Sequence, residues 1–160
     1  MSYARRLLPF LFLPLLVLLL ISCDKKRFFE ENKSIPNGVW NNSERVKFDV
    51  PVKDTLDGYN FFLNVRNAGD YPYSNLYLFV HTTTPDGIIA GDTLECQLAS
   101  VDGKWLGTGI GNLKFSRFFF QENVRFHKAG VYHFEIEQAM RVKTLKGIHD
   151  IGIRIEKNTK

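Results

Sequence analysis

The sequence predicts an all-β protein, a single β-sandwich of about seven or eight strands that is either Ig-like or jelly-roll-like. Apolar and polar residues alternate with a period of two along seven separate segments, which is the pattern of half-buried strands. The breaks between these segments carry turn-forming residues. Helical periodicity is confined to a single turn at 28–34 or at 139–146.

The alternation is clear in the segment that contains Phe61, Leu63 and Val65, which share one face while Asn64 lies on the other. Because successive side chains of a strand point to opposite faces, each such segment has one face for a core and one for solvent. The same pattern recurs in six other segments, in chain order 46–50, 76–80, 94–98, 118–120, 132–136 and 151–155.

Turn chemistry separates these segments. Thr84-Pro85-Asp86-Gly87 places proline where a φ of about −65° is required and glycine where a positive φ is allowed. Asp57-Gly58, Asp102-Gly103 and Ala129-Gly130 are similar breaks. Short strands joined by regular turns are typical of a β-sandwich, and no internal repeat is visible.

The N-terminus predicts a lipoprotein signal peptide over residues 1–22. Arg5 and Arg6 precede the apolar stretch 7–21, which is shorter than the roughly 20 residues that a membrane-spanning helix needs. The stretch ends in Leu20-Ile21-Ser22-Cys23, a lipobox in which a small residue precedes the cysteine. The competing interpretation is an ordinary signal peptide or a membrane anchor that ends in a cysteine by chance.

Cys23 is therefore predicted to be the lipidated N-terminus of the mature chain. Its sulfur would carry diacylglycerol, and further acyl chains such as palmitate would make the anchoring stable, since one chain alone binds only marginally. The predicted organisation is a lipidated N-terminus and tether over 23–45 and a sandwich domain over 46–160. The basic run Lys25-Lys26-Arg27 either rests on anionic lipid or is part of a solvated tether.

The composition excludes some partners. Removing residues 1–22, which contain two arginines and no acid, leaves 138 residues with 19 basic and 17 acidic side chains. That length suits one domain, and a balance so close to neutral gives no case for nucleic-acid binding. Cys96 is then the only cysteine left after lipidation of Cys23, so no disulfide within the chain is possible, and it is predicted to be a buried thiol of the core.

The sequence contains no pattern of residues that indicates catalysis. The four histidines His81, His127, His133 and His149 lie outside metal-ligand spacing, and no nucleophile elbow or phosphate-binding glycine loop is present. We therefore expect no enzyme activity, no metal, no small-molecule substrate and no cofactor other than the covalent lipid.

Aromatic residues supply the candidate contact surface. Tyr71, Tyr73 and Tyr77 lie in and after one loop, and Trp105 lies in a glycine-spaced loop. Exposed aromatic rings suit a protein contact or a sugar platform. In the alternative interpretation Trp40, Tyr73 and Trp105 seal the ends of the sandwich. Phe119 is added to the candidates because it must face away from its two neighbouring phenylalanines.

The sequence resembles the gliding-motility lipoprotein GldH family of the Bacteroidetes from the lipobox nearly to its end. The strings that carry the resemblance include Ser34-Ile35-Pro36-Asn37-Gly38-Val39-Trp40, Asp70-Tyr71-Pro72-Tyr73-Ser74-Asn75-Leu76, Gly103-Lys104-Trp105-Leu106-Gly107-Thr108-Gly109 and Gln138-Ala139-Met140-Arg141. The resemblance implies an envelope lipoprotein needed for gliding motility and linked to the type IX secretion machinery. It offers no catalytic motif to carry over, and the implied partners are other gliding or secretion proteins of the envelope.

The resemblance also bears on location and role. In that phylum Asp24 does not dictate retention in the inner membrane, and lipoproteins exported to the surface carry an acidic run where this chain has basic residues. The expected location is the outer membrane, lipid-anchored and facing the periplasm. The expected role is a non-enzymatic scaffold or accessory subunit, and the alternative is a glycan-binding β-sandwich lipoprotein.

Overall fold

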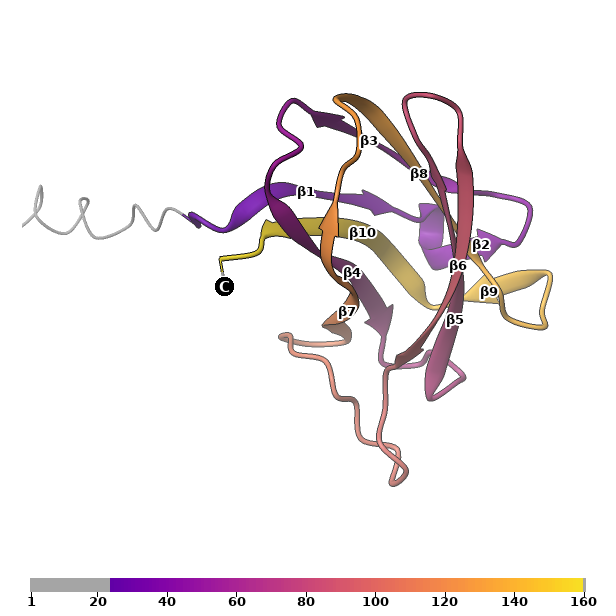
Figure 1. Ribbon diagram of the computed structural model, residues 1–160. Coiled ribbons are helices and arrows are strands. Elements are labelled where there is room, and N and C mark those ends of the chain that lie inside the picture. Colours follow the sequence, from indigo (N-terminus) through magenta and orange to yellow (C-terminus); the bar gives the residue numbers. More distant parts are fainter. Residues whose placement is uncertain (1–23, 160) are drawn as a thin grey trace, which may run out of the picture.

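The computed structural model describes residues 24–159, so the predicted signal peptide and Cys23 lie outside the described residues. Two four-stranded antiparallel sheets pack face to face (Figure 1). Sheet I has the strand order β1-β10-β4-β7, sheet II has the order β3-β8-β5-β6, and β2 pairs with β9 in a short ladder. The elements are β1 (Arg27–Ser34), the 3-10 turn η1 (Pro36–Gly38), β2 (Val39–Asn41), β3 (Val46–Val52), β4 (Gly58–Ala68), β5 (Asn75–Thr83), β6 (Ile89–Gln97), β7 (Leu113–Arg125), β8 (Gly130–Gln138), β9 (Thr144–Lys146) and β10 (Ile148–Lys157).

The chain order of the strands is that of a jelly roll. From β1 onward the main strands cross alternately between sheet I and sheet II, and only the hairpin of β5 and β6 stays within one sheet. An Ig sandwich instead keeps consecutive strands such as A and B together in one sheet. The predicted all-β sandwich is confirmed, and of its two alternatives the structure adopts the jelly roll.

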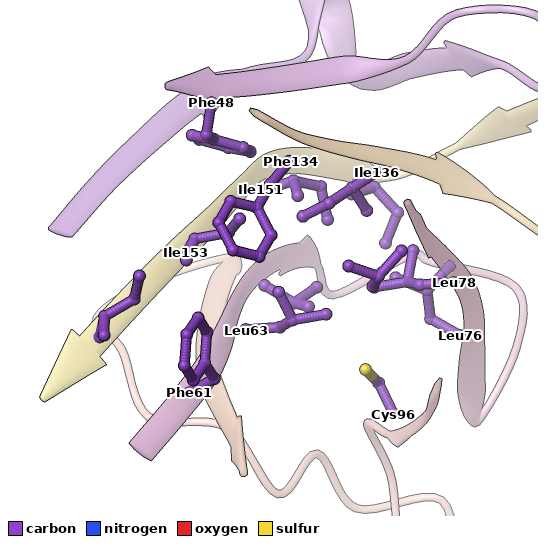
Figure 2. Packing of buried hydrophobic residues seen from close by; sticks show 14 of the residues in the cluster. Phe48, Phe61, Leu63, Leu76, Leu78, Cys96, Phe134, Ile136, Ile151 and Ile153 are labelled. Carbon is purple, nitrogen blue, oxygen red and sulfur yellow. The ribbon is translucent and has the colours of Figure 1, made fainter. Parts of the chain in front are cut away.

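The inward faces of the two sheets form one core (Figure 2). Phe48 and Ile136 from sheet II meet Leu63 and Ile153 from sheet I, and each of these side chains is almost fully buried. Burying a side chain of this size contributes about 1.5–3 kcal/mol. Cys96 also lies in this core as a free thiol, and its burial raises its pKa to about 12. The prediction of a buried core thiol is confirmed.

The predicted tether over 23–45 is wrong from Arg27 onward. β1 pairs with β10 along its length and is an edge strand of sheet I, and neither 28–34 nor 139–146 contains a helical turn. Trp40 is only 1% exposed. Its indole nitrogen donates a hydrogen bond to the Glu44 carbonyl at 2.8 Å. The sandwich therefore begins about twenty residues earlier than the boundary predicted at residue 46.

The alternation of apolar and polar residues does not predict β1, because both faces of this strand are rich in polar residues. Glu31 and Lys33 occupy positions whose β10 partners, Ile153 and Ile151, face the core. The Lys33 side chain extends over the ring of Phe48, with its nitrogen 5.2 Å from the ring centroid. Long charged side chains bury their methylene stems in this way at the rim of a core, which a hydrophobicity pattern does not detect.

The strands of sheet I define two ends of the domain. At one end of sheet I, β1 and β4 begin and β10 ends. Two backbone hydrogen bonds of 2.8 Å join the strands there: the Lys157 amide donates to the Lys26 carbonyl, and the Asn158 amide donates to the Gly58 carbonyl. We call this the anchor end. At the other end, Ala68 pairs with Leu113, and the loops 69–74 and 98–112 emerge there. We call this the far end.

Candidate functional site

Tyr71 and Trp105 pack together at the far end. The Tyr71 ring lies 5.6 Å from the Tyr73 ring and 6.4 Å from the Trp105 ring, measured between centroids. The Tyr71 hydroxyl donates a hydrogen bond to the Asn75 carbonyl at 3.0 Å, and burial raises the pKa of this hydroxyl. Trp105 is half-buried and packs against the core.

The prediction that Tyr71 is a contact residue is wrong. Tyr71 is only 4% exposed, so its ring closes the end of the sandwich and offers no surface to a partner. Its loop returns into β5, which carries the ring inward together with Leu76. Tyr73 and Trp105 are half-buried and pack against the core, as a sealing role requires, but part of each ring stays exposed, and their binding role stays a prediction.

Tyr77 lines a groove beside Tyr73. We call this the tyrosine groove; it has a volume of about 460 Å³ and is lined by Tyr73, Tyr77 and the loop residues 139–142. Gln138 holds that loop in place, because its side-chain oxygen accepts the Met140 amide and its nitrogen donates to the Val142 carbonyl, both at 2.9 Å. Met140 was not among the predicted contact residues, and no pattern along the chain links it to Tyr77.

The outward face of sheet I carries a polar network that sequence reasoning also missed. Asn64, at the centre of this face, is 1% exposed and is fully engaged. Its amide nitrogen donates to Glu30 at 3.1 Å and to Asn32 at 3.0 Å, and its oxygen accepts from Arg117 Nε at 2.8 Å. Three strands from distant parts of the sequence therefore meet at one amide.

Arg154 extends the network toward the anchor end. Only 7% of its side chain is exposed, and its guanidinium donates to Asp24, Glu30 and Glu156. Burial alone would lower the pKa of Arg154, but the hydrogen bonds to these carboxylates outweigh it and raise the pKa. In return, the hydrogen bond from Arg154 lowers the pKa of Asp24.

A hollow opens beside Asn64. We call it the polar hollow; it has a volume of about 190 Å³ and is lined by Asn32, Asn64, Val65, Arg66, Phe115 and Asp150. Asp150 accepts hydrogen bonds from Arg66 and, at 2.8 Å, from Ser34. Gly152 lies between Asn32 and Asn64 in the strand register and leaves room there, because a Cβ on it would lie 2.0 Å from the Asn32 side-chain oxygen.

Aromatic side chains border this face along β7. Phe119 is 52% exposed and packs against Phe62 at 5.4 Å between ring centroids. Phe118 and Phe120 turn toward the core instead, as the alternation predicts. Phe115 lies 5.7 Å from the Arg117 guanidinium and forms one side of the polar hollow. Whether Phe119 contacts a partner remains a prediction.

Hydrogen bonds and burial move the pKa values of several groups further from neutral pH. Hydrogen bonds from basic side chains lower the pKa of Asp24 and Glu135, whereas burial raises the pKa of Cys96 and Tyr71. General acid–base catalysis instead favours a pKa near the working pH. Among residues 24–159, no group of three or more His, Cys, Asp or Glu side chains is arranged to hold a metal ion. Nor does any helix in this part of the chain have the length and hydrophobicity to cross a membrane.

By its fold the chain is a small protein of the jelly-roll β-sandwich class. A model of the GldH lipoprotein family matches residues 27–155, and the chain belongs to this family. It is 43% identical over 149 residues to the gliding motility lipoprotein GldH of Flavobacterium johnsoniae, covering 89% of this chain and 92% of that protein. It is 40% identical to a GldH homolog of Christiangramia forsetii, with 89% and 91% covered.

Solved structures with a similar chain path are far more distant in sequence. A carbohydrate-binding module of family CBM28, specific for non-crystalline cellulose, matches with a TM-score of 0.43 and 8% identity, covering 81% of this chain and 73% of that one. The module TmCBM61, solved with β-1,4-galactotriose, matches with a TM-score of 0.33 and 9% identity, covering 84% and 92%.

Proposed function

We propose that this chain is a non-enzymatic, lipid-anchored subunit of the gliding-motility apparatus that also serves the linked type IX secretion machinery. The observation that carries the proposal is the relationship to the Flavobacterium johnsoniae protein, which spans nearly the whole of both chains and whose name refers to gliding motility. The family is also described as one of lipoproteins, which agrees with the lipobox that ends at Cys23.

A scaffolding role, rather than catalysis, is supported by the state of the ionisable groups. The buried Arg154 guanidinium donates hydrogen bonds to Asp24, Glu30 and Glu156, and burial keeps the one free thiol in the described residues protonated in the core. Side chains with their charges paired in this way stabilise a surface and give it specificity, but they are poor proton donors and acceptors.

The proposed contact surface is the tyrosine groove. Tyr77 is 38% exposed beside the half-buried Tyr73 and Met140. Tyrosine and methionine suit a protein contact because they bury a large area, while the phenol also offers a hydrogen bond. The partner proposed for this groove is another envelope protein of the same apparatus.

The proposed location is the periplasmic face of the outer membrane. The basic residues Lys25-Lys26-Arg27 after Cys23 support it, because they replace the acidic run expected of a surface-exported lipoprotein. Protease added to intact cells is therefore expected to leave the domain whole, and to digest it once the outer membrane is permeabilised. Digestion in intact cells would contradict the location.

A genetic replacement tests the function. In Flavobacterium johnsoniae that lacks its own GldH, this chain is expected to restore colony spreading and secretion of type IX substrates. The Cys23→Ala variant is expected to restore neither. If the wild-type chain is present in the envelope and restores neither activity, the proposal is wrong.

Two matched variants then test the contact surface. Tyr77 and Phe79 both point outward from β5 and are 38% and 39% exposed, but only Tyr77 lines the groove. Tyr77→Ala is expected to raise the Kd for the partner recovered by crosslinking about thirtyfold, the effect of a hot-spot residue worth roughly 2 kcal/mol. Phe79→Ala is expected to behave as wild type, and equal losses in both variants would refute the assignment.

Glycan binding is the second candidate, and the polar hollow favours it. The hollow combines an amide, a guanidinium and a carboxylate with the ring of Phe115, so it can both donate and accept hydrogen bonds beside an apolar surface. A sugar ring presents hydroxyls at its edge and C–H groups on its faces. The face of sheet I around the hollow has four carboxylates and three guanidiniums, and this balance favours a neutral ligand over an anion. The carboxylates are those of Asp24, Glu30, Asp150 and Glu156, and the guanidiniums are those of Arg66, Arg117 and Arg154.

Calorimetric titration with a panel of neutral oligosaccharides tests this candidate. Phe115→Ala and Arg66→Ala are expected to lower the affinity for any sugar that binds, whereas Phe119→Ala, on the same face but outside the hollow, is expected to retain it. This candidate would be eliminated if no member of the panel gave a heat of binding, or if the Phe115→Ala and Arg66→Ala variants bound the sugar as tightly as Phe119→Ala does.

A further inference from the structure

Asp24, the residue directly after Cys23, is hydrogen-bonded to the folded domain. The Asp24 carboxylate accepts a hydrogen bond from the buried Arg154 guanidinium. The Asp24 carbonyl accepts the Arg27 amide at 3.3 Å, and the Lys26 carbonyl accepts the Lys157 amide at 2.8 Å. The described chain is therefore hydrogen-bonded to the domain from residue 24 onward.

This connection limits how far the domain can stand from a lipid on Cys23. An extended residue spans at most about 3.3–3.6 Å, so the three residues from Cys23 to Lys26 reach roughly 10 Å even if Asp24 were released. With Asp24 held by Arg154, the attachment point lies closer still. The anchor end must then rest at the membrane surface whenever Cys23 carries its lipid.

The chemistry of the anchor end suits a layer of anionic lipid headgroups. Leu56, in the loop that leads into β4, is 81% exposed there. Acidic side chains are also present, and Asp57 pairs with Lys157 at 2.5 Å. The segments 24–27, 53–58, 122–125 and 157–158 form this end, and basic residues outnumber acidic ones in them. They are Lys25, Lys26, Arg27, Lys53, Arg125 and Lys157 against Asp24, Asp54, Asp57 and Glu122.

We propose that the anchor end docks directly on the bilayer, with its basic side chains on anionic headgroups and Leu56 at the interface. This proposal rests on the proposed lipidation of Cys23 and deepens the proposed function, because it fixes the orientation of the domain. β4 runs from the anchor end to the far end over 11 residues, about 35 Å at roughly 3.3 Å per residue. The tyrosine groove, which Tyr73 lines from the far-end loop 69–74, is thereby presented to partners on the side away from the membrane.

Fluorescence quenching on vesicles tests the orientation. The acylated protein, purified from envelopes, is reconstituted into vesicles of phosphatidylethanolamine and phosphatidylglycerol that contain a nitroxide-labelled headgroup. A fluorophore is placed on Leu56→Cys or on Val101→Cys, which is fully exposed in the far-end loop. Cys96 does not interfere, because it is buried and its pKa is raised to about 12.

Quenching is expected to be severalfold greater at position 56 than at position 101. A flexible Gly-Ser segment inserted between Cys23 and Asp24 is expected to reduce this difference, since it separates the domain from the anchor. Equal quenching at both positions in the acylated protein without the insertion would overturn the docking. An unacylated Cys23, detected by mass spectrometry, would instead overturn the anchor on which it rests, and the colony-spreading assay tests the motility function separately from both.

Discussion

Gly152→Ala is expected to disrupt the outward face of sheet I where β1 approaches β10. A Cβ at this position would lie 2.0 Å from the Asn32 side-chain oxygen and 2.7 Å from the backbone oxygen of Glu31. The Asn32 side chain can rotate away, but it then loses the hydrogen bond that Asn64 donates to it at 3.0 Å. The Glu31 carbonyl belongs to the strand backbone and cannot rotate away, so β1 must shift at this position.

The size of the effect follows from these two contacts. Overpacking against a strand backbone costs about 1–3 kcal/mol. The lost hydrogen bond between Asn32 and Asn64 adds about 1 kcal/mol, because it leaves part of a buried amide without its partner. The free energy of unfolding is therefore expected to fall by about 2–4 kcal/mol.

Urea denaturation followed by tryptophan fluorescence measures this change, and the buried Trp40 is a suitable reporter. Gly91→Ala is the matched control: Gly91 also lies in a strand, and a Cβ there would meet only His81 Nδ1 at 3.8 Å. This control is expected to leave the midpoint unchanged or to raise it slightly. If Gly152→Ala unfolds at the same urea concentration as the control, the close packing inferred between β1 and β10 is refuted.

Three further predictions concern buried and paired groups. Cys96 is expected to resist alkylation at pH 8 in the folded protein and to react in urea, because its pKa of about 12 keeps the thiol protonated; rapid modification in buffer would contradict its burial. Arg154→Ala is expected to cost about 3 kcal/mol of unfolding free energy, since it leaves Asp24 and Glu156 without the cation that hydrogen-bonds to them, and a change below roughly 1 kcal/mol would be inconsistent with this pairing. The Arg154 hydrogen bond lowers the pKa of Asp24 below its ordinary 3.8, so the contribution of this pair is present above that pH and is lost as the pH falls through the lowered value. The protection of the Arg27 amide against hydrogen exchange, measured relative to its intrinsic rate at each pH, is accordingly expected to fall only at strongly acidic pH, and a loss of protection near pH 6 would exclude Asp24 as the cause.

Much of the sandwich could be predicted from the pattern along the chain. The segment 61–65 lies in β4 with Phe61 and Leu63 buried, as the alternation requires. The spacing of Cys96 with Leu94 and Leu98 predicts a core position, and Cys96 lies in the core. These predictions succeed because a period of two is a local property that a strand expresses wherever it is placed.

The candidate surfaces could be predicted only in part. Tyr77 is exposed as expected, but Tyr71 is buried, because loop residues carry no periodicity that assigns them to a face. No pattern of residues along the chain indicates the polar hollow. Asn32, Asn64 and Asp150 become neighbours only because β10 lies between β1 and β4.

The sequence by itself determined the all-β class, most of the strands, the buried thiol and the family resemblance, since each depends on residue types and on spacings within a few residues. The tertiary structure alone decided the jelly-roll order, the inclusion of β1, the polar network around Asn64 and the fixing of Asp24 beside the predicted anchor. The physical reason is that these features depend on which strands pair. Pairing joins residues as far apart in the chain as Asp24 and Arg154, and alternation along a single strand is the same for every possible neighbour.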